Sequence, residues 1–132
     1  MYPGDLYYSE DHQWARVDDG VATVGITHYA QEQLGEVVYV ELPNRDDEAS
    51  RGELLGTVES VKAVADVNSP VSGRVVEVNA SLDDDPTQIN QDPYGRGWLA
   101  KIDLSDPAEM RSLMNAQAYV KHLQQLGEEK GG

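Results

Sequence analysis

Hydrophobic and polar residues alternate through most of the region between residues 14 and 104. A two-residue period predicts β-strands, because successive side chains of a strand point to opposite faces. Turn residues divide this region, and strands this short and numerous favour a flattened β-barrel or sandwich. The predicted strands are 14–17, 21–26, 36–42, 54–60, 65–68, 74–78 and 98–104.

Turn residues and alternation also predict finer features of this β core. The Asp19-Gly20 step suits the positive φ angles of a tight hairpin. In the strand over 36–42, alternation places Val38, Val40 and Leu42 on one face. We expect a solvated loop over 44–51, turns over 69–73 and 94–97, and an acidic surface loop over 81–93.

Helices are predicted after the first hairpin and at the C-terminus. Thr27 suits the N-cap of a short helix over 28–34, and Gly35 suits its end. Asp106, followed by a proline and an acid, is typical of a helix start. Helical spacing then predicts one apolar face with Met110, Leu113 and Met114. A second helix, capped by Asn115, has an apolar face with Tyr119, Val120, Leu123 and Leu126. We expect both faces to pack on the domain itself. We expect this last helix to end before Gly127 and residues 128–132 to fray.

Length and charge narrow the class of protein. The 132 residues fit a single domain over 1–132, with a β core at about 14–104 and a helical segment at about 106–126. The chain has 24 acidic and 10 basic residues, and a net charge of −14 would repel nucleic acid. It contains no run of about 20 apolar residues that could span a bilayer. Because the start of the chain has no signal or transit pattern, we expect a cytoplasmic protein that binds no membrane. A monomer is the default expectation for its oligomeric state.

Self-contained catalytic or metal chemistry finds no support in the sequence. An EF-hand loop starting at Asp83 would need glycine and glutamate where Gln88 and Tyr94 stand. The three histidines lie in separate segments without metal-motif spacing. The glycine pattern that begins at Gly95 opens a strand rather than a helix, which excludes a dinucleotide site. We therefore expect no catalytic residue and no metal, and, because the chain has no cysteine, any sulfur redox chemistry must come from an attached group.

The hairpin formed by strands 54–60 and 65–68 has an unusual tip. Tight hairpins favour Gly, Asn or Asp at the turn, whereas this tip contains Val61, Lys62, Ala63 and Val64. Local rules often fail at functional positions. A lone basic residue raised from an acidic surface between small apolar neighbours is a candidate modification site, although most exposed lysines are simply solvated.

This tip lies within a longer stretch that is similar to a known family. Residues 59–63, read as Glu-Ser-Val-Lys-Ala, and residues 66–73, read as Asp-Val-Asn-Ser-Pro-Val-Ser-Gly, resemble the lipoyl attachment region of the glycine cleavage system H protein family. Blocks at 8–14, 21–27, 30–35, 40–43, 92–95 and 97–99 resemble that family in order and spacing. The resemblance implies a mainly β fold of the lipoyl/biotinyl type, the barrel-sandwich hybrid, with small helices.

The resemblance also implies a non-catalytic carrier. Lys62 would bear lipoic acid in amide linkage. The carrier would take the aminomethyl group of glycine from glycine decarboxylase, the P protein, to the aminomethyltransferase, the T protein. Dihydrolipoyl dehydrogenase, the L protein, would reoxidise it. A lipoate ligase, or a lipoyl or octanoyl transferase, would attach the group, and we expect Glu59, Ser60, Val61 and Ala63 to guide that enzyme or the other partners.

Three further positions match the groove that shelters the lipoyl arm in this family. They are Ile26, Asp66 and Gln13, where glutamine replaces the usual glutamate. The alternative for residue 13 is a side chain that points to solvent beside Trp14. Val64-Ala65 also replaces a smaller and more polar pair. Two other functions stay open: an H-like lipoyl donor or scaffold that passes lipoate to other enzymes, and an unmodified acidic binding module.

Overall fold

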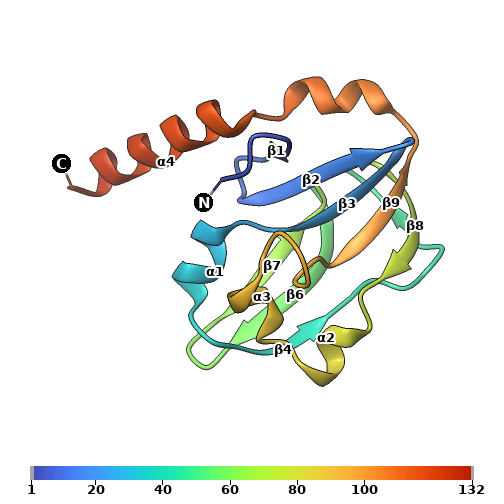
Figure 1. The fold of residues 1–132 in the computed structure, drawn as a ribbon, viewed down its shortest axis with the longest axis horizontal. Helices are drawn as coiled ribbons and strands as arrows, with labels where there is room; N and C mark the ends of the chain where they lie inside the picture. The colour runs from blue at the N-terminus through green and yellow to red at the C-terminus, as the bar shows by residue number, and fades with distance from the viewer. Residues whose placement is uncertain (1, 132) are drawn as a thin grey trace.

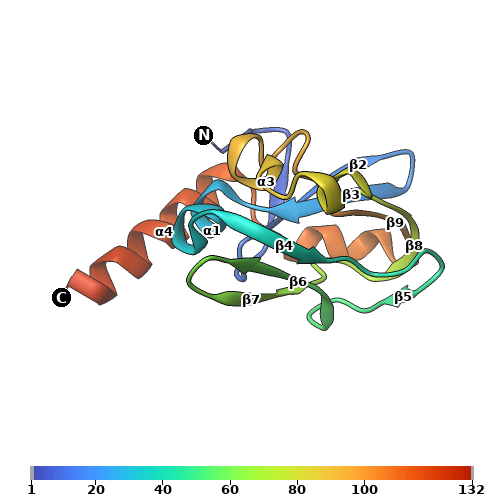
Figure 2. The ribbon, with the colours of Figure 1, turned by 90° about the horizontal axis from the view of Figure 1, so that it is seen from below.

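The computed structural model describes residues 2–131, with side chains for residues 2–127. The chain folds into two antiparallel sheets with helices at their margins (Figure 1), which confirms the predicted mainly β architecture. The first sheet has the strand order β1 (Tyr7–Tyr8), β2 (Gln13–Asp18), β3 (Val21–Ile26), β9 (Ala100–Leu104), β8 (Gly73–Val78) and β5 (Glu48–Ala49). The second has the order β4 (Val37–Glu41), β6 (Leu54–Ser60) and β7 (Val64–Asn68), and forms a separate layer in Figure 2.

The first hairpin and the first helix form as the sequence predicts. Asp19 and Gly20 have φ angles of 54° and 76° and join β2 to β3. Helix α1 (His28–Leu34) begins where the side chain of Thr27 accepts a hydrogen bond from the Ala30 amide. It ends at Gly35, which has a φ of 81° that glycine adopts at little cost.

Strand β4 contradicts the predicted face for Val38, whereas Val40 and Leu42 both pack on the core as predicted. A β-bulge shifts the register between Val37 and Tyr39, so strict alternation fails there. Val37 and Val40 are buried, whereas the side chains of Val38 and Tyr39 are 43% and 57% exposed. The extra residue of the bulge therefore turns two successive apolar side chains to the surface.

Two segments predicted as loops contain regular structure. Within 44–51, β5 pairs with β8 and its Ala49 is buried, although the rest of the segment is exposed. Within 81–93, two short helices form, α2 (Ser81–Asp84) and α3 (Gln88–Gln91). Each helix inserts one apolar side chain, Leu82 or Ile89, into the core. One buried residue among many charged ones is too weak a pattern to predict a helix of four residues.

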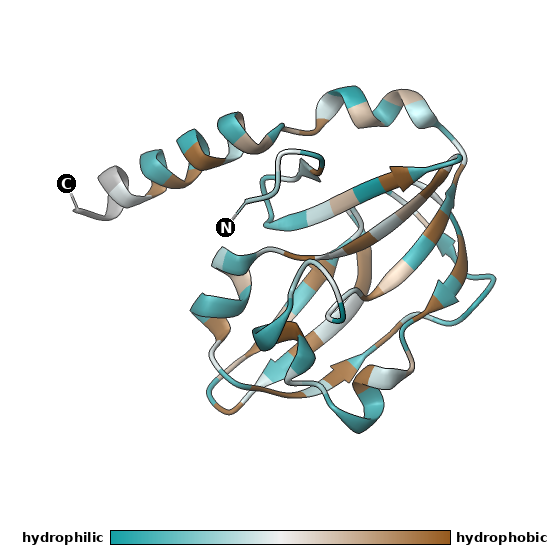
Figure 3. Ribbon diagram, viewed as in Figure 1, coloured by the Kyte–Doolittle hydropathy of each residue, from teal (hydrophilic) through white to brown (hydrophobic). Residues whose placement is uncertain are grey.

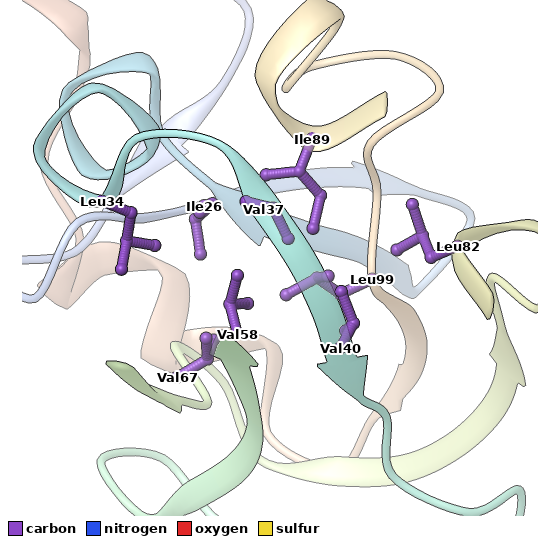
Figure 4. Packing of buried hydrophobic residues seen from close by; sticks show 9 residues of the cluster. All are labelled: Ile26, Leu34, Val37, Val40, Val58, Val67, Leu82, Ile89 and Leu99. Carbon is purple, nitrogen blue, oxygen red and sulfur yellow. The ribbon is translucent and has the colours of Figure 1, made fainter. Parts of the chain in front are cut away.

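The core between the two sheets draws on both of them and on the small helices. Figure 4 shows its largest cluster, to which the second sheet contributes Val37, Val40, Val58 and Val67. The cluster contains Ile26, Leu34, Val37, Val40, Val58, Val67, Leu82, Ile89 and Leu99. A second cluster lies under β8 and β9, and a third joins Leu6, Tyr8, Trp14 and Tyr119.

The C-terminal segment follows the prediction at its start and departs from it at its end. Asp106 caps a 3₁₀ helix, η1 (Pro107–Ser112). The carboxylate of Glu109 in this helix accepts hydrogen bonds from the amide and hydroxyl of Ser72. Asn115 caps α4 (Ala116–Gly131), which carries alternating hydrophobic and hydrophilic bands in Figure 3.

Helix α4 passes through Gly127 to Gly131, so the predicted end before Gly127 is wrong, while the fraying of residues 128–132 stays a prediction. A glycine inside a helix costs only about 1 kcal/mol, which does not stop it. Residue 132 lies outside the described residues. The predicted apolar faces do pack on the domain, with Met110 and Leu113 against the second cluster and Met114 and Leu123 against the third.

Gly25→Ala is expected to lower the free energy of unfolding by about 1–3 kcal/mol, the usual cost of overpacking a core. A β-carbon at residue 25 would lie 2.8 Å from three ring atoms of Trp14. That ring is fully buried, and its nitrogen donates to the Pro93 carbonyl at 3.0 Å, so it cannot move away cheaply. Urea denaturation measures the change. Gly4→Ala, where a β-carbon meets nothing within 4 Å, is the control; equal stability of the two variants would contradict this packing.

Candidate functional site

Lys62 lies at the tip of the β6–β7 hairpin, as the sequence predicts. The hairpin tip, residues 61–63, closes where the Ser60 amide donates to the Ala63 carbonyl at 2.8 Å. The buried hydroxyl oxygen of Ser60 accepts hydrogen bonds from the amides of Lys62, at 3.3 Å, and Ala63, at 3.1 Å. Positive φ angles at non-glycine residues of the described chain occur elsewhere, at His12, Asp19 and Asp46. The tip therefore forms without Gly, Asn or Asp because a serine hydroxyl satisfies its amides.

The tip is also held from the side. The Val61 amide donates to the Glu36 carbonyl at 3.2 Å, which ties the tip to the segment that enters β4. The lysine stem turns toward α1: Cε of Lys62 lies 3.7 Å from the place that a β-carbon would occupy at Gly35. None of the ion pairs found in the described part of the chain involves Lys62, and its side chain is exposed. An exposed side chain thus extends from a hydrogen-bonded backbone.

A groove of about 340 Å³ runs beside α1, and we refer to it as the α1 groove. The structure brings Ile26, Asp66 and Gln13 together in its lining, although they come from three different strands. Apolar side chains form much of the wall, and the carboxylates in the lining are those of Asp66 and Asp11. The groove is lined by Asp11, His12, Gln13, Ile26, Tyr29, Ala30, Gln33, Leu34, Ala65, Asp66 and Val67.

Gln13 does not point to solvent, so that alternative is wrong. Only 3% of the residue is exposed. Its amide oxygen accepts from the Ser9 hydroxyl at 2.6 Å, and its amide nitrogen donates to the Asp11 carbonyl at 2.9 Å. Gln13 therefore braces the turn that presents Asp11 to the groove. The sequence does not single out Asp11, because one exposed acid in an acidic chain gives no distinguishing signal.

Helix α4 and the loop around Tyr94 fix the start of α1, which forms one wall of the groove. The hydroxyl of Tyr119 lies 2.7 Å from Nδ1 of His12 and 2.8 Å from the hydroxyl of Thr27. The hydroxyl of Tyr94 accepts a hydrogen bond from the His28 amide. Burial raises the pKa of Tyr119 and raises the pKa of Tyr94 to about 12, so both tyrosines are neutral at physiological pH. The helical spacing of Tyr119 predicts its burial but not this polar contact.

In the described residues, no three histidine, cysteine or acidic side chains are grouped closely enough to hold a metal ion. Among the helices of residues 2–131, none is long and apolar enough to cross a membrane.

Ser60→Ala is expected to loosen the tip and to lower the free energy of unfolding by about 1 kcal/mol, the typical net value of lost hydrogen bonds. The amides of Lys62 and Ala63 would lose the hydroxyl that accepts from them. Hydrogen exchange followed by NMR should become faster at these two amides. Ser50→Ala, at an exposed serine in another loop, is the control; unchanged exchange at the tip in Ser60→Ala would show that the hydroxyl does not hold it.

Comparisons with known proteins agree with this geometry. The sequence model of the family described as "Glycine cleavage H-protein" matches residues 6–126. The chain is 52% identical over 130 residues to "Glycine cleavage system H protein 4" of Aquifex aeolicus, covering 98% of this chain and 76% of the relative. It is 53% identical over 122 residues to "Glycine cleavage system H protein" of Marinobacter nauticus, covering 92% and 94% of the two chains.

Among solved structures, the crystal structure of a glycine cleavage system H protein from Mycobacterium marinum superposes with a TM-score of 0.83 at 41% identity, covering 95% of this chain and 98% of that one. Sequence and structure thus match over nearly the whole chain, including the tip and the groove. The chain belongs to the glycine cleavage H-protein family.

Proposed function

We propose that this chain is the lipoyl carrier of a glycine cleavage system, with lipoic acid bound as an amide to Nζ of Lys62. One observation carries the proposal: an exposed lysine stands on a braced hairpin whose second strand, β7, also forms a wall of the α1 groove. A carrier needs both features, a handle that enzymes can reach and a place to shelter what it carries. The chain itself performs no catalysis in this role.

The residues around Lys62 fit an attached lipoyl group. Lys62 is exposed and flanked by the small or apolar residues Val61 and Ala63, so an enzyme can reach its amine. The α1 groove offers about 340 Å³ with apolar walls, which suits a hydrocarbon arm. When attached, the lipoyl group supplies a disulfide that takes up the aminomethyl group of glycine and is reduced, chemistry that a chain without cysteine cannot supply.

The groove residues would shelter and orient the end of the arm. Ile26 and Val67 are buried core residues whose surfaces also line the groove, and such walls exclude water that would hydrolyse a labile group. The carboxylates of Asp66 and Asp11 favour a cationic amine nearby. Gln13 adds no charge, and its role is to hold the turn that carries Asp11.

The partners in this proposal are the P, T and L proteins and an enzyme that attaches lipoate. The net charge of −14 would steer the carrier toward basic surfaces of these enzymes. Glu59, Val61 and Ala63 are exposed around Lys62 and would contact the attaching enzyme, whereas the buried Ser60 would act by holding the tip. The monomeric state and the cytoplasmic setting stay predictions.

The α1 groove favours the shuttle over an H-like lipoyl donor or scaffold. Simple transfer of lipoate requires only the tip, whereas sheltering an aminomethyl group also requires a groove that carries negative charge. The α1 groove, with Asp11 and Asp66 in its lining beside the hairpin that bears Lys62, supports this choice.

The mass of the protein from its native source is expected to show a lipoyl increment on Lys62, located by peptide mapping across residues 52–74. Lys62→Arg should remove the increment and abolish glycine cleavage in the reconstituted system, because arginine cannot form the amide. An unmodified lysine in cells that make lipoate, or a silent Lys62→Arg, would support an unmodified acidic binding module instead.

Asp66→Ala is expected to slow aminomethyl transfer about two- to fivefold while lipoylation proceeds normally, because an exposed charge pair contributes up to about 1 kcal/mol. The measurement is the single-turnover rate with fully lipoylated protein and the aminomethyltransferase. Asp103→Ala removes an exposed acid from β9 in the other sheet and should leave the rate unchanged. Equal rates for the two variants would count against the groove and favour the scaffold.

A further inference from the structure

The three-stranded sheet has an outer face that the carrier role does not yet explain. Strand pairing places Tyr39 beside Glu59 and Glu59 beside Val64, so these three residues form one row across β4, β6 and β7. The next row, Val40, Val58 and Ala65, faces the core. Because alternate residues of a strand face opposite sides, the row of Tyr39, Glu59 and Val64 faces outward. This row, with Val38 and Val61, is the outer tip face.

The outer tip face is unusually apolar for a solvated surface. The side chains of Tyr39, Val64 and Val61 are 57%, 63% and 69% exposed. The exposed face of an antiparallel sheet is normally polar, and exposed apolar patches mark contacts with other molecules. The bulge in β4 adds Val38 to the same region. Large exposed apolar side chains therefore gather around Lys62.

The charge of this face is negative apart from Lys62. Glu59 stands between Tyr39 and Val64. The exposed Glu41 ends β4, and the exposed Glu36 lies just before it. Lys62 is the one lysine or arginine in residues 36–42 and 54–68. A partner surface that complements this face would have an apolar centre and a lysine or arginine opposite Glu59. It would also have an opening that admits the Lys62 side chain.

We propose that the outer tip face is the docking surface for the enzyme that acylates Lys62, and that Tyr39 and Val64 are its apolar anchors. This inference rests on the proposed function and extends it from the tip to two neighbouring strands. The unmodified lysine has no arm, so the acylating enzyme must bring its bound acyl group within bonding distance of Nζ. Its surface must therefore cover the side chains that surround the tip, whereas enzymes that act on a long arm can work at a distance from the sheet.

The acylation of Lys62 at this interface uses an acyl adenylate as its co-reactant. The nitrogen of Lys62 attacks the carbonyl carbon of the adenylate, and a C–N bond forms. The C–O bond to the phosphate breaks, AMP leaves with the electron pair, and the nitrogen gives its proton to a base of the enzyme.

Tyr39→Ser is expected to raise the KM for enzymatic lipoylation about tenfold while kcat changes less than twofold, because the anchor acts in binding rather than in chemistry. The assay uses the full unmodified chain, a purified lipoate ligase, ATP and lipoate, and follows the intact mass. Tyr39→Phe should retain the wild-type KM, since the ring supplies the apolar contact. Val64→Ser should resemble Tyr39→Ser.

Leu54→Ser is the matched control. Leu54 is 62% exposed on β6 but pairs with Asn68 at the end of the hairpin far from the tip, so its loss should leave KM unchanged. Thermal unfolding of all variants shows whether the fold is kept. As a measurement independent of turnover, the affinity of Lys62→Arg for the ligase should fall about tenfold when Tyr39→Ser is added.

Several results would overturn the inference. One is a wild-type KM in Tyr39→Ser or an equal rise in Leu54→Ser. A second is a larger loss with the aminomethyltransferase or decarboxylase than in lipoylation, which would assign the face to those enzymes. A third is a dimer that Tyr39→Ser disrupts, which would make the face a self-contact. Failure of the wild-type chain to accept lipoate at all would instead contradict the proposed function.

Discussion

The packing of the β6–β7 hairpin against the core is the constraint on which the tip and the groove both depend. Val58 of β6 and Val67 of β7 are buried in the same cluster as Ile26 and Leu34. Because side chains alternate along a strand, the burial of these two valines fixes which residues of the hairpin face outward. It sets the direction of the tip, and it brings the edge of β7 against α1, where the groove forms. A shift of one residue in register would bury Glu59 and expose Val58.

Rigidity below Lys62 and freedom at its amine serve different needs. The Ser60 hydroxyl and the Glu36 carbonyl accept hydrogen bonds from the amides of the tip and so brace the backbone beneath Lys62. The lysine side chain makes no ion pair in the described chain and lies near a glycine, where no side chain obstructs it. A tether that is fixed at its base and free at its end keeps a high effective concentration of its cargo at each partner.

The sequence predicts local features best where one residue has one clear physical reason to be there. Thr27 and Gly35 bound α1 because a hydroxyl cap and a positive φ are local requirements. The exposure of Val38 in β4 differs from the prediction, because a bulge depends on the pairing of two strands and leaves no mark on either alone. Each of the two helices within 81–93 has one side chain in the core, Leu82 or Ile89, and only the surrounding fold determines that these side chains are buried.

The candidate site shows the same limit. The sequence motif identifies Lys62, and Ile26, Asp66 and Gln13 do line one groove. The sequence does not show that Gln13 holds the turn that carries Asp11. Gln13 shows why. At 3% exposure its amide must both accept from Ser9 and donate to the Asp11 carbonyl. An ionised glutamate could accept but not donate, and it would set a buried charge against a carbonyl oxygen. Glutamine therefore satisfies this turn, and the negative charge of the groove comes from the carboxylates of Asp11 and Asp66 in its lining.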